Sequence, residues 1–202
     1  MIEVNTQSSI KIGNIYFDPF KIDKEYGDAR FIFITHSHYD HFDMDSINKV
    51  RNDSTIFVVP NDEDIISKLK GCNLFVCSIN KEYEVGGIKF RTIPAYNLNK
   101  SFHKKDYGWL GYVVYLDKSY YIMGDTDVTE EALMVKCDYL FVPIGGTYTM
   151  DYKEAIDYVN SIKPKYVTPI HYGSIVGNFE MFDEFADGID DDVTVINLLN
   201  IS

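Results

Sequence analysis

Three of the five histidines in this chain lie in one short segment, His36-Ser37-His38-Tyr39-Asp40-His41, which directly follows the apolar run at residues 31–35. The apolar run predicts a buried strand. Alternate side chains of an extended chain point the same way, so His36 and His38 can hold one ion together. If the chain turns after this pair, the side chains of Asp40 and His41 can reach a second ion nearby. Imidazole with carboxylate suits Zn²⁺, and also Mn²⁺ or Fe²⁺.

The rest of the composition favours one folded domain, residues 1–202. Hydrophobic residues make up 46% of the chain, and its 16 Tyr and 13 Phe argue against disorder. No apolar run approaches the roughly 18 residues that span a bilayer, and the first residues do not read as a signal peptide. We therefore expect a cytoplasmic protein without a membrane partner.

The formal net charge of −12 weighs against long nucleic acid as a partner, because the only basic cluster is Lys104-Lys105. The expected partner is a small-molecule substrate, and an anionic one is among the candidates. The three cysteines form no CxxC pair and lie beside apolar residues, which indicates buried free thiols and not ligands. They are Cys72, Cys77 and Cys137.

Short β-rich runs recur along the chain, separated by turn signals. The expected strands are residues 9–12, 14–17, 31–35, 55–59, 74–77, 88–93, 112–116, 120–123, 139–142, 166–169 and 193–198. Gly86-Gly87 predicts a two-residue hairpin turn. Helices are expected at residues 61–69, 129–134, 151–162 and 179–185. Early hairpins followed by alternating strands and helices predict an α/β protein with two sheets flanked by helices.

The pattern H-x-H-x-D-H after a strand resembles the signature of the metallo-β-lactamase superfamily. In that family a third histidine follows for the first metal, then an aspartate that bridges both metals, then a last histidine. Here His103 follows a strand-rich interval, Asp125 comes after Gly124 at the end of an expected strand, and His171 ends another. The stretches PAYN…H…GYVV…MGDTD and PIGG…IHYG are similar to the compact branch that contains ascorbate-6-phosphate lactonases and N-acyl-phosphatidylethanolamine phospholipases D.

The resemblance implies a four-layer αββα sandwich and two divalent metal ions, with zinc first and manganese or iron as alternatives. It implies that one ion binds His36, His38 and His103. The other ion would bind Asp40, His41 and His171, with Asp125 between the two.

Several neighbouring residues leave alternatives open. Asn97 is the nearest substitute if His103 is an ordinary loop residue, and Asp127 is a rival to Asp125. Gly145-Gly146 would let the backbone approach a ligand, or form a plain turn before a helix. Trp109 is expected to pack in the interior. The lysines flanking His103 could meet an anionic substrate or lie in a solvated loop; they are Lys100, Lys104 and Lys105.

The expected reaction is hydrolysis of a small ester, lactone or phosphodiester by a hydroxide that two metal ions activate. Asp40 would orient the hydroxide or take its proton, as the family suggests, and Tyr148 is the candidate proton donor to the leaving group. The alternative is a di-iron redox or gas-binding protein on the same scaffold. Flavodiiron proteins carry an acidic residue where this chain has His38, which weighs against the redox alternative.

Overall fold

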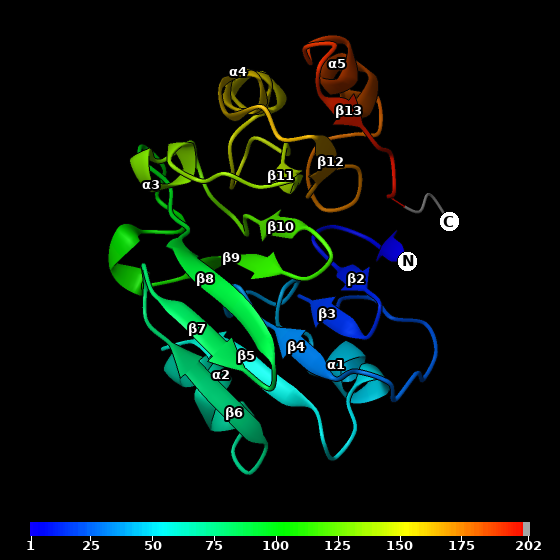
Figure 1. Cartoon of the computed structure of the whole chain (residues 1–202), viewed down its shortest axis with the longest axis vertical. Helices are drawn as coiled ribbons and strands as arrows, with labels where there is room; N and C mark the ends of the chain where they lie inside the picture. Colours follow the sequence, from blue (N-terminus) through cyan, green and yellow to red (C-terminus); the bar gives the residue numbers. More distant parts are fainter. Residues whose placement is uncertain (200–202) are drawn as a thin grey trace. The chain divides into compact units, whose positions relative to one another are not determined.

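The computed structural model describes residues 1–199, which form two compact units. The first unit is Met1–Ser78 together with Leu198 and Leu199, and the second is Ile79–Asn197. Each unit has one β-sheet of its own (Figure 1). The assignment of residues 1–202 to a single domain stays a prediction.

The first unit has a six-stranded sheet in the order β1-β2-β3-β4-β5-β6. β1 to β3 are antiparallel, and β3 to β6 are parallel. Parallel neighbours need crossover connections, which helices α1 and α2 provide. The bounds are β1 Ile2–Val4, β2 Ile10–Ile12, β3 Ile15–Phe17, β4 Phe31–Phe33, α1 Met44–Val50, β5 Ile56–Pro60, α2 Glu63–Lys68 and β6 Asn73–Cys77.

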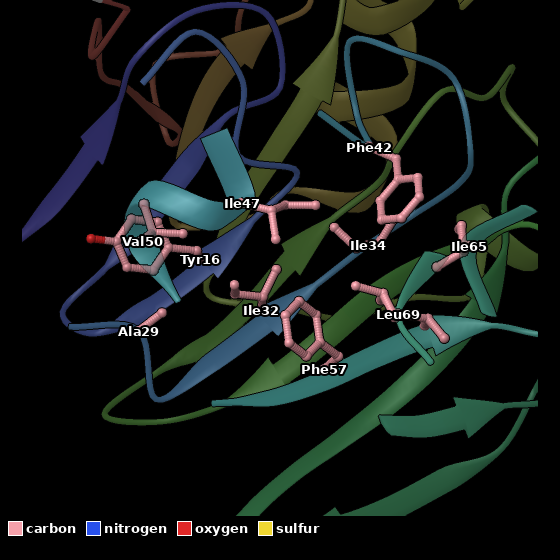
Figure 2. Packing of buried hydrophobic residues seen from close by; sticks show 11 residues of the cluster. Tyr16, Ala29, Ile32, Ile34, Phe42, Ile47, Val50, Phe57, Ile65 and Leu69 are labelled. Carbon is pink, nitrogen blue, oxygen red and sulfur yellow. The ribbon is translucent and has the colours of Figure 1, made fainter. Parts of the chain in front are cut away.

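The helices of this unit pack on one face of β4 and β5, as Figure 2 shows. Ile32 and Phe57 come from the strands, and Ile47 comes from α1. All three side chains are buried, and the burial of each one stabilises the fold by about 1.5–3 kcal/mol. This packing fixes β4, and with it the start of the histidine segment that follows the strand.

The second unit has a seven-stranded sheet in the order β13-β12-β11-β10-β9-β8-β7. β7 to β10 form an antiparallel meander, and β10 to β13 are parallel. The strands are β7 Glu82–Val85, β8 Ile88–Pro94, β9 Leu110–Tyr115, β10 Ser119–Ile122, β11 Tyr139–Pro143, β12 Tyr166–Ile170 and β13 Thr194–Val195. The helices are η1 Lys105–Tyr107, α3 Glu130–Leu133, α4 Tyr152–Ile162 and α5 Met181–Asp187.

The expected α/β class with two sheets and flanking helices is confirmed, and each expected strand and helix is present with shifted ends. α4 begins at Asp151, whose carboxylate accepts from Glu154 N while the Glu154 side chain accepts from Asp151 N. The expected elements do not include β1, β7, α1 or the short η1, although the hairpin turn expected at Gly86-Gly87 joins β7 to β8. In residues 1–199 no helix has the length and apolar character required to cross a membrane.

Candidate metal centre

The candidate metal ligands of the described chain are all histidines and aspartates. In the first unit they are His36, His38, Asp40 and His41, and in the second unit His103, Asp125 and His171. These are the seven positions that the sequence singled out. The geometry within each unit follows.

His36 and His38 direct ring nitrogens toward one point just beyond β4. Nε2 of His36 lies 3.1 Å from Nδ1 of His38. Two nitrogens bound at about 2.0–2.1 Å to one tetrahedral zinc ion lie about 3.3 Å apart. The pair therefore has the spacing of two ligands on a shared ion, as alternation along an extended chain predicts.

A buried network of Asp18 and Thr35 sets the orientation of two of these histidines. Asp18 Oδ2 lies 2.8 Å from Nδ1 of His41, and it accepts a hydrogen bond from Thr35 Oγ1 at 2.6 Å. Because Nδ1 of His41 donates to Asp18, Nε2 is the nitrogen that can bind an ion. Thr35 Oγ1 also lies 2.9 Å from Nδ1 of His36, which assigns Nε2 of His36 to ligation in the same way.

Asp18 is completely buried, and its charge state depends on opposing effects. Burial raises the pKa of its carboxyl, while the hydrogen bonds from His41 and Thr35 act in the opposite direction. The backbone amide of Thr35 also donates to Asp18 Oδ1 at 2.8 Å. These donors satisfy the carboxylate inside the protein, as a buried acceptor requires.

Asp40 is buried beside the same histidines. Gln7 Nε2 donates to Asp40 Oδ2 at 3.4 Å, and His41 Nε2 lies 3.6 Å from that oxygen. Gln7 is fully buried and has a left-handed backbone, with φ of 51°. Gln7 therefore holds the Asp40 carboxylate next to a nitrogen that is a proposed metal ligand.

In the second unit, one oxygen of Asp125 lies between two imidazoles. Asp125 Oδ2 is 3.2 Å from His103 Nε2 and 3.1 Å from His171 Nε2, and all three side chains are almost fully buried. Both distances again match the separation of about 3.3 Å between two ligands of one zinc ion. A single oxygen with this relation to two histidines has the arrangement expected of a bridging carboxylate.

The sheet topology explains why these groups meet. Asp125 follows β10 and His171 follows β12, and both strands pair in parallel with β11 between them (Figure 1). The carboxyl ends of parallel strands lie at the same edge of a sheet. His103 reaches that edge on the loop between β8 and η1.

Two of the three histidine and aspartate ligands in this unit have an unusual backbone. His103 has φ of 53° and His171 has φ of 59°, in the left-handed region that costs a non-glycine residue about 1–2 kcal/mol. A Cβ at Gly145 would lie 2.3 Å from the His171 carbonyl oxygen. Gly145 therefore permits a close approach of the His171 backbone.

Asn97 holds His103 in place and does not replace it. The backbone amide of Asn97 donates to the His103 carbonyl at 2.7 Å, and Asn97 Nδ2 donates to the Tyr148 carbonyl at 2.7 Å. Nδ2 also lies 3.4 Å from His103 Nδ1. Trp109 packs edge-to-face on the His103 ring with centroids 5.3 Å apart, so its predicted packing role is confirmed.

Asp127, the rival of Asp125, is directed at the loop that precedes His103. Its carboxylate accepts from Leu98 N at 2.9 Å and from Lys100 Nζ. Lys105 Nζ in turn donates to Glu131 at 2.9 Å. Two of the three lysines around His103 are therefore held in ion pairs with carboxylates of the protein.

The three cysteines are free, as predicted. Cys77 is buried, whereas Cys72 and Cys137 are partly buried. Burial raises the pKa of the Cys77 and Cys137 thiols to about 12, so both stay protonated at neutral pH. A protonated thiol is a poor metal ligand and a poor nucleophile.

Sequence reasoning missed Asp18, Thr35 and Gln7. A signal existed for Asp18, because it directly follows β3, the parallel neighbour of β4, and polar residues after adjacent parallel strands meet at one edge. Gln7 had no such signal. It lies in the turn between β1 and β2, and nothing in its spacing relates it to the distant Asp40.

Comparison with known proteins gives consistent matches. The family model described as "Beta-lactamase superfamily domain" matches residues 10–171. A UPF0173 metal-dependent hydrolase of Pyrococcus abyssi is 30% identical over 161 residues, which are 75% of this chain and 70% of that protein.

Two crystal structures have a similar fold. A protein of Parabacteroides distasonis described as a metal-dependent hydrolase superposes with a TM-score of 0.81 at 26% identity, covering 98% of this chain and 91% of that one. A protein of Thermotoga maritima described as a Zn-dependent hydrolase of the metallo-beta-lactamase superfamily gives 0.64 at 20% identity, covering 98% and 97%. The second likeness concerns the fold alone.

Proposed function

Because this chain belongs to the metallo-β-lactamase superfamily, as a metal-dependent hydrolase, we propose that it cleaves a small ester, lactone or phosphodiester with two divalent metal ions. Zinc is the first choice for both ions, since the donor atoms are imidazole nitrogens and carboxylate oxygens. Manganese and iron suit the same donors and are the alternatives.

The proposed ligands divide between the two ions as the family pattern implies. His36, His38 and His103 hold the first ion, and Asp40, His41 and His171 hold the second. Asp125 bridges the ions. When bound, the ions supply Lewis acidity and lower the pKa of a water molecule enough for attack at neutral pH.

The single observation that carries this proposal is the position of Asp125 Oδ2, within 3.2 Å of His103 Nε2 and 3.1 Å of His171 Nε2. The proposal assigns those two histidines to different ions. A carboxylate that bridges the two ions would face both histidines, as this buried oxygen does. Within the first unit, the orientation of His41 by Asp18 supports the same conclusion.

Asp40 and Tyr148 are the proposed proton-transfer groups. The Asp40 carboxylate, held by Gln7, would orient the attacking water or accept its proton. The Tyr148 hydroxyl would donate a proton to the leaving group. Asn97 links this residue to the proposed ligand His103, because its Nδ2 donates to the Tyr148 carbonyl and lies 3.4 Å from His103 Nδ1.

The test is to load the purified protein with Zn²⁺ or Mn²⁺, and to assay a phosphodiester probe beside a panel of esters and lactones. Asp125→Asn removes the bridging charge with little change of shape, and circular dichroism checks that it folds. Asp117→Asn is the matched control, since Asp117 is an exposed aspartate in the turn after β9 that bonds Lys118 and Tyr120.

Turnover by the wild type and by Asp117→Asn, with loss in Asp125→Asn, is the expected result. The substrate class that is cleaved then separates the phosphodiesterase and lactonase branches. Folded, metal-loaded protein that cleaves none of the three classes would contradict the proposal. Iron in the protein as isolated, together with that inactivity, would move the di-iron redox alternative to the front.

A further inference from the structure

The loop that carries His103 presents exposed apolar side chains next to a proposed metal ligand. Phe102, which precedes His103, is 47% exposed, and Leu98 on the same loop is 56% exposed. The Phe102 ring packs edge-to-face on Tyr148, with centroids 4.8 Å apart and an interplanar angle of 86°. An apolar group that covered these side chains would remove their surface from water, which is favourable.

The loop is held rigidly in this exposed arrangement. Asn97 closes it through a hydrogen bond from its backbone amide to the His103 carbonyl, and ties it to the Tyr148 carbonyl through Nδ2. Asp127 fastens the middle of the loop through Leu98 N and Lys100. The segment from Asn97 to His103 is therefore held at its ends and in its middle by polar contacts.

Two of the three lysines of the loop are already paired with carboxylates of the protein. Lys100 is neutralised by Asp127, and Lys105 by Glu131, while Lys104 is exposed. An apolar group on the rings of Phe102 and Tyr148 needs no charge partner and removes apolar surface from water.

From these contacts we infer that Phe102 and Tyr148 form an apolar subsite for the substrate, which takes an uncharged alkyl or acyl chain next to the bond that is cleaved. This inference rests on the proposed function and narrows it to neutral esters and lactones with an apolar chain. Phe102 is then a specificity-determining residue. The ring of Tyr148 supports Phe102, independently of any role of its hydroxyl.

The experiment is a chain-length series on the zinc-loaded protein. Substrates are p-nitrophenyl acetate, butyrate and octanoate, beside γ-butyrolactone, γ-octalactone and γ-dodecalactone. Each half-buried methylene should raise kcat/KM about twofold, mainly through KM. The variant is Phe102→Ser. The control is Tyr115→Ser, since Tyr115 on β9 is a similarly exposed aromatic, at 45%, in the same unit.

In the expected result, Phe102→Ser flattens the dependence of kcat/KM on chain length and keeps the metal content of the wild type. Tyr115→Ser keeps the wild-type slope. A flat slope in the wild type, or the same slope in Phe102→Ser, overturns the subsite while the hydrolase proposal stands.

A separate readout covers the case in which no substrate is cleaved. The neutral analogues octanamide and acetamide are then titrated by calorimetry into the wild type and Phe102→Ser. Tighter binding of octanamide to the wild type, lost in Phe102→Ser, supports the subsite even though no ester or lactone is cleaved. Equal binding of both amides, or equal binding to both proteins, overturns the subsite.

Discussion

Oδ2 of Asp18 lies 2.8 Å from Nδ1 of His41, and both side chains are completely buried. The contact fixes the ring orientation of His41 and makes Nε2 the nitrogen available to an ion. Asp18 therefore acts on the centre through His41, and also through Thr35, which contacts His36. It is a positioning residue.

Asp18→Asn is expected to weaken metal binding by about 10–100-fold, because the amide cannot accept from His41 and Thr35 as a carboxylate does. Competition with a chromophoric chelator measures the affinity. Asp28→Asn is the control, since Asp28 is an aspartate of the same unit that bonds Tyr16 and Lys11. An affinity for zinc that Asp18→Asn leaves unchanged would show that His41 needs no orientation.

Substitution of the two aspartates after β10 should have different effects on activity and on metal content. Asp125→Asn is expected to lower kcat/KM by about a hundredfold or more and to reduce the number of bound ions, because Asp125 faces both histidines of its unit. Asp127→Asn should keep its bound metal, and its kcat/KM should fall by no more than about tenfold. The reason is that Asp127 contacts only the loop before His103. Elemental analysis and kinetics measure both effects, and the reverse order would make Asp127 the bridging residue.

Most of the candidate centre could be predicted because its ligands follow strands. His36 comes shortly after an apolar β run of the first unit. Asp125 and His171 come shortly after β10 and β12 of the second unit, whose parallel strands bring their carboxyl ends to one edge of that sheet. Those relations are local in the sequence. The residues that orient the ligands are different in kind, because the Asp18–His41 and Gln7–Asp40 contacts join distant segments without any periodic pattern.

The missed helix α1 has a clearer explanation. Asp43 caps it by accepting from the amides of Asp45 and Ser46, and Ile47 and Val50 form its buried face. This cap lies two residues after His41, the last residue of the histidine segment. A search for a capping aspartate before spaced apolar residues would have found the helix.

Gly145→Ala tests the packing that supports His171. The added Cβ would meet the His171 carbonyl oxygen at 2.3 Å, so the backbone must shift. We expect the free energy of unfolding to fall by about 1–3 kcal/mol and zinc affinity to fall with it. Gly71→Ala is the control, since a Cβ there meets nothing within 4 Å and only its backbone conformation is strained. Urea denaturation and chelator competition measure the two effects; unchanged zinc affinity in Gly145→Ala would contradict the prediction.

Acid should lower the free energy of unfolding of the first unit, because it protonates the Asp28 carboxylate. Partial burial raises the pKa of this carboxyl, but the hydrogen bonds from Tyr16 and Lys11 outweigh burial and leave the pKa below its ordinary value of 3.8. A lowered pKa in the folded state means that the stabilisation is present above about pH 4 and is lost as the pH falls through the folded-state value.

Asp28→Asn should therefore reduce the free energy of unfolding at neutral pH by about 0.5–1 kcal/mol, and by much less in strong acid. The contribution is small because the side chain is 45% exposed. Urea denaturation of the wild type and the variant at the two pH values measures this difference. A loss of stability that is equal at both would rule out the ionised carboxylate as its source.

Tyr148→Phe separates the two roles proposed for this residue. The substitution removes the hydroxyl and keeps the ring that packs on Phe102, so the dependence on chain length should be unchanged. Loss of a proton donor should slow poor leaving groups most, by about 10²–10⁴-fold for an alkyl ester, and should hardly affect p-nitrophenyl esters, which need no protonation. Metal content stays the same, and Tyr152→Phe at the start of α4 is the control. If alkyl and p-nitrophenyl esters lose equally, Tyr148 has no part in proton transfer, and the donor is then another group or a water molecule.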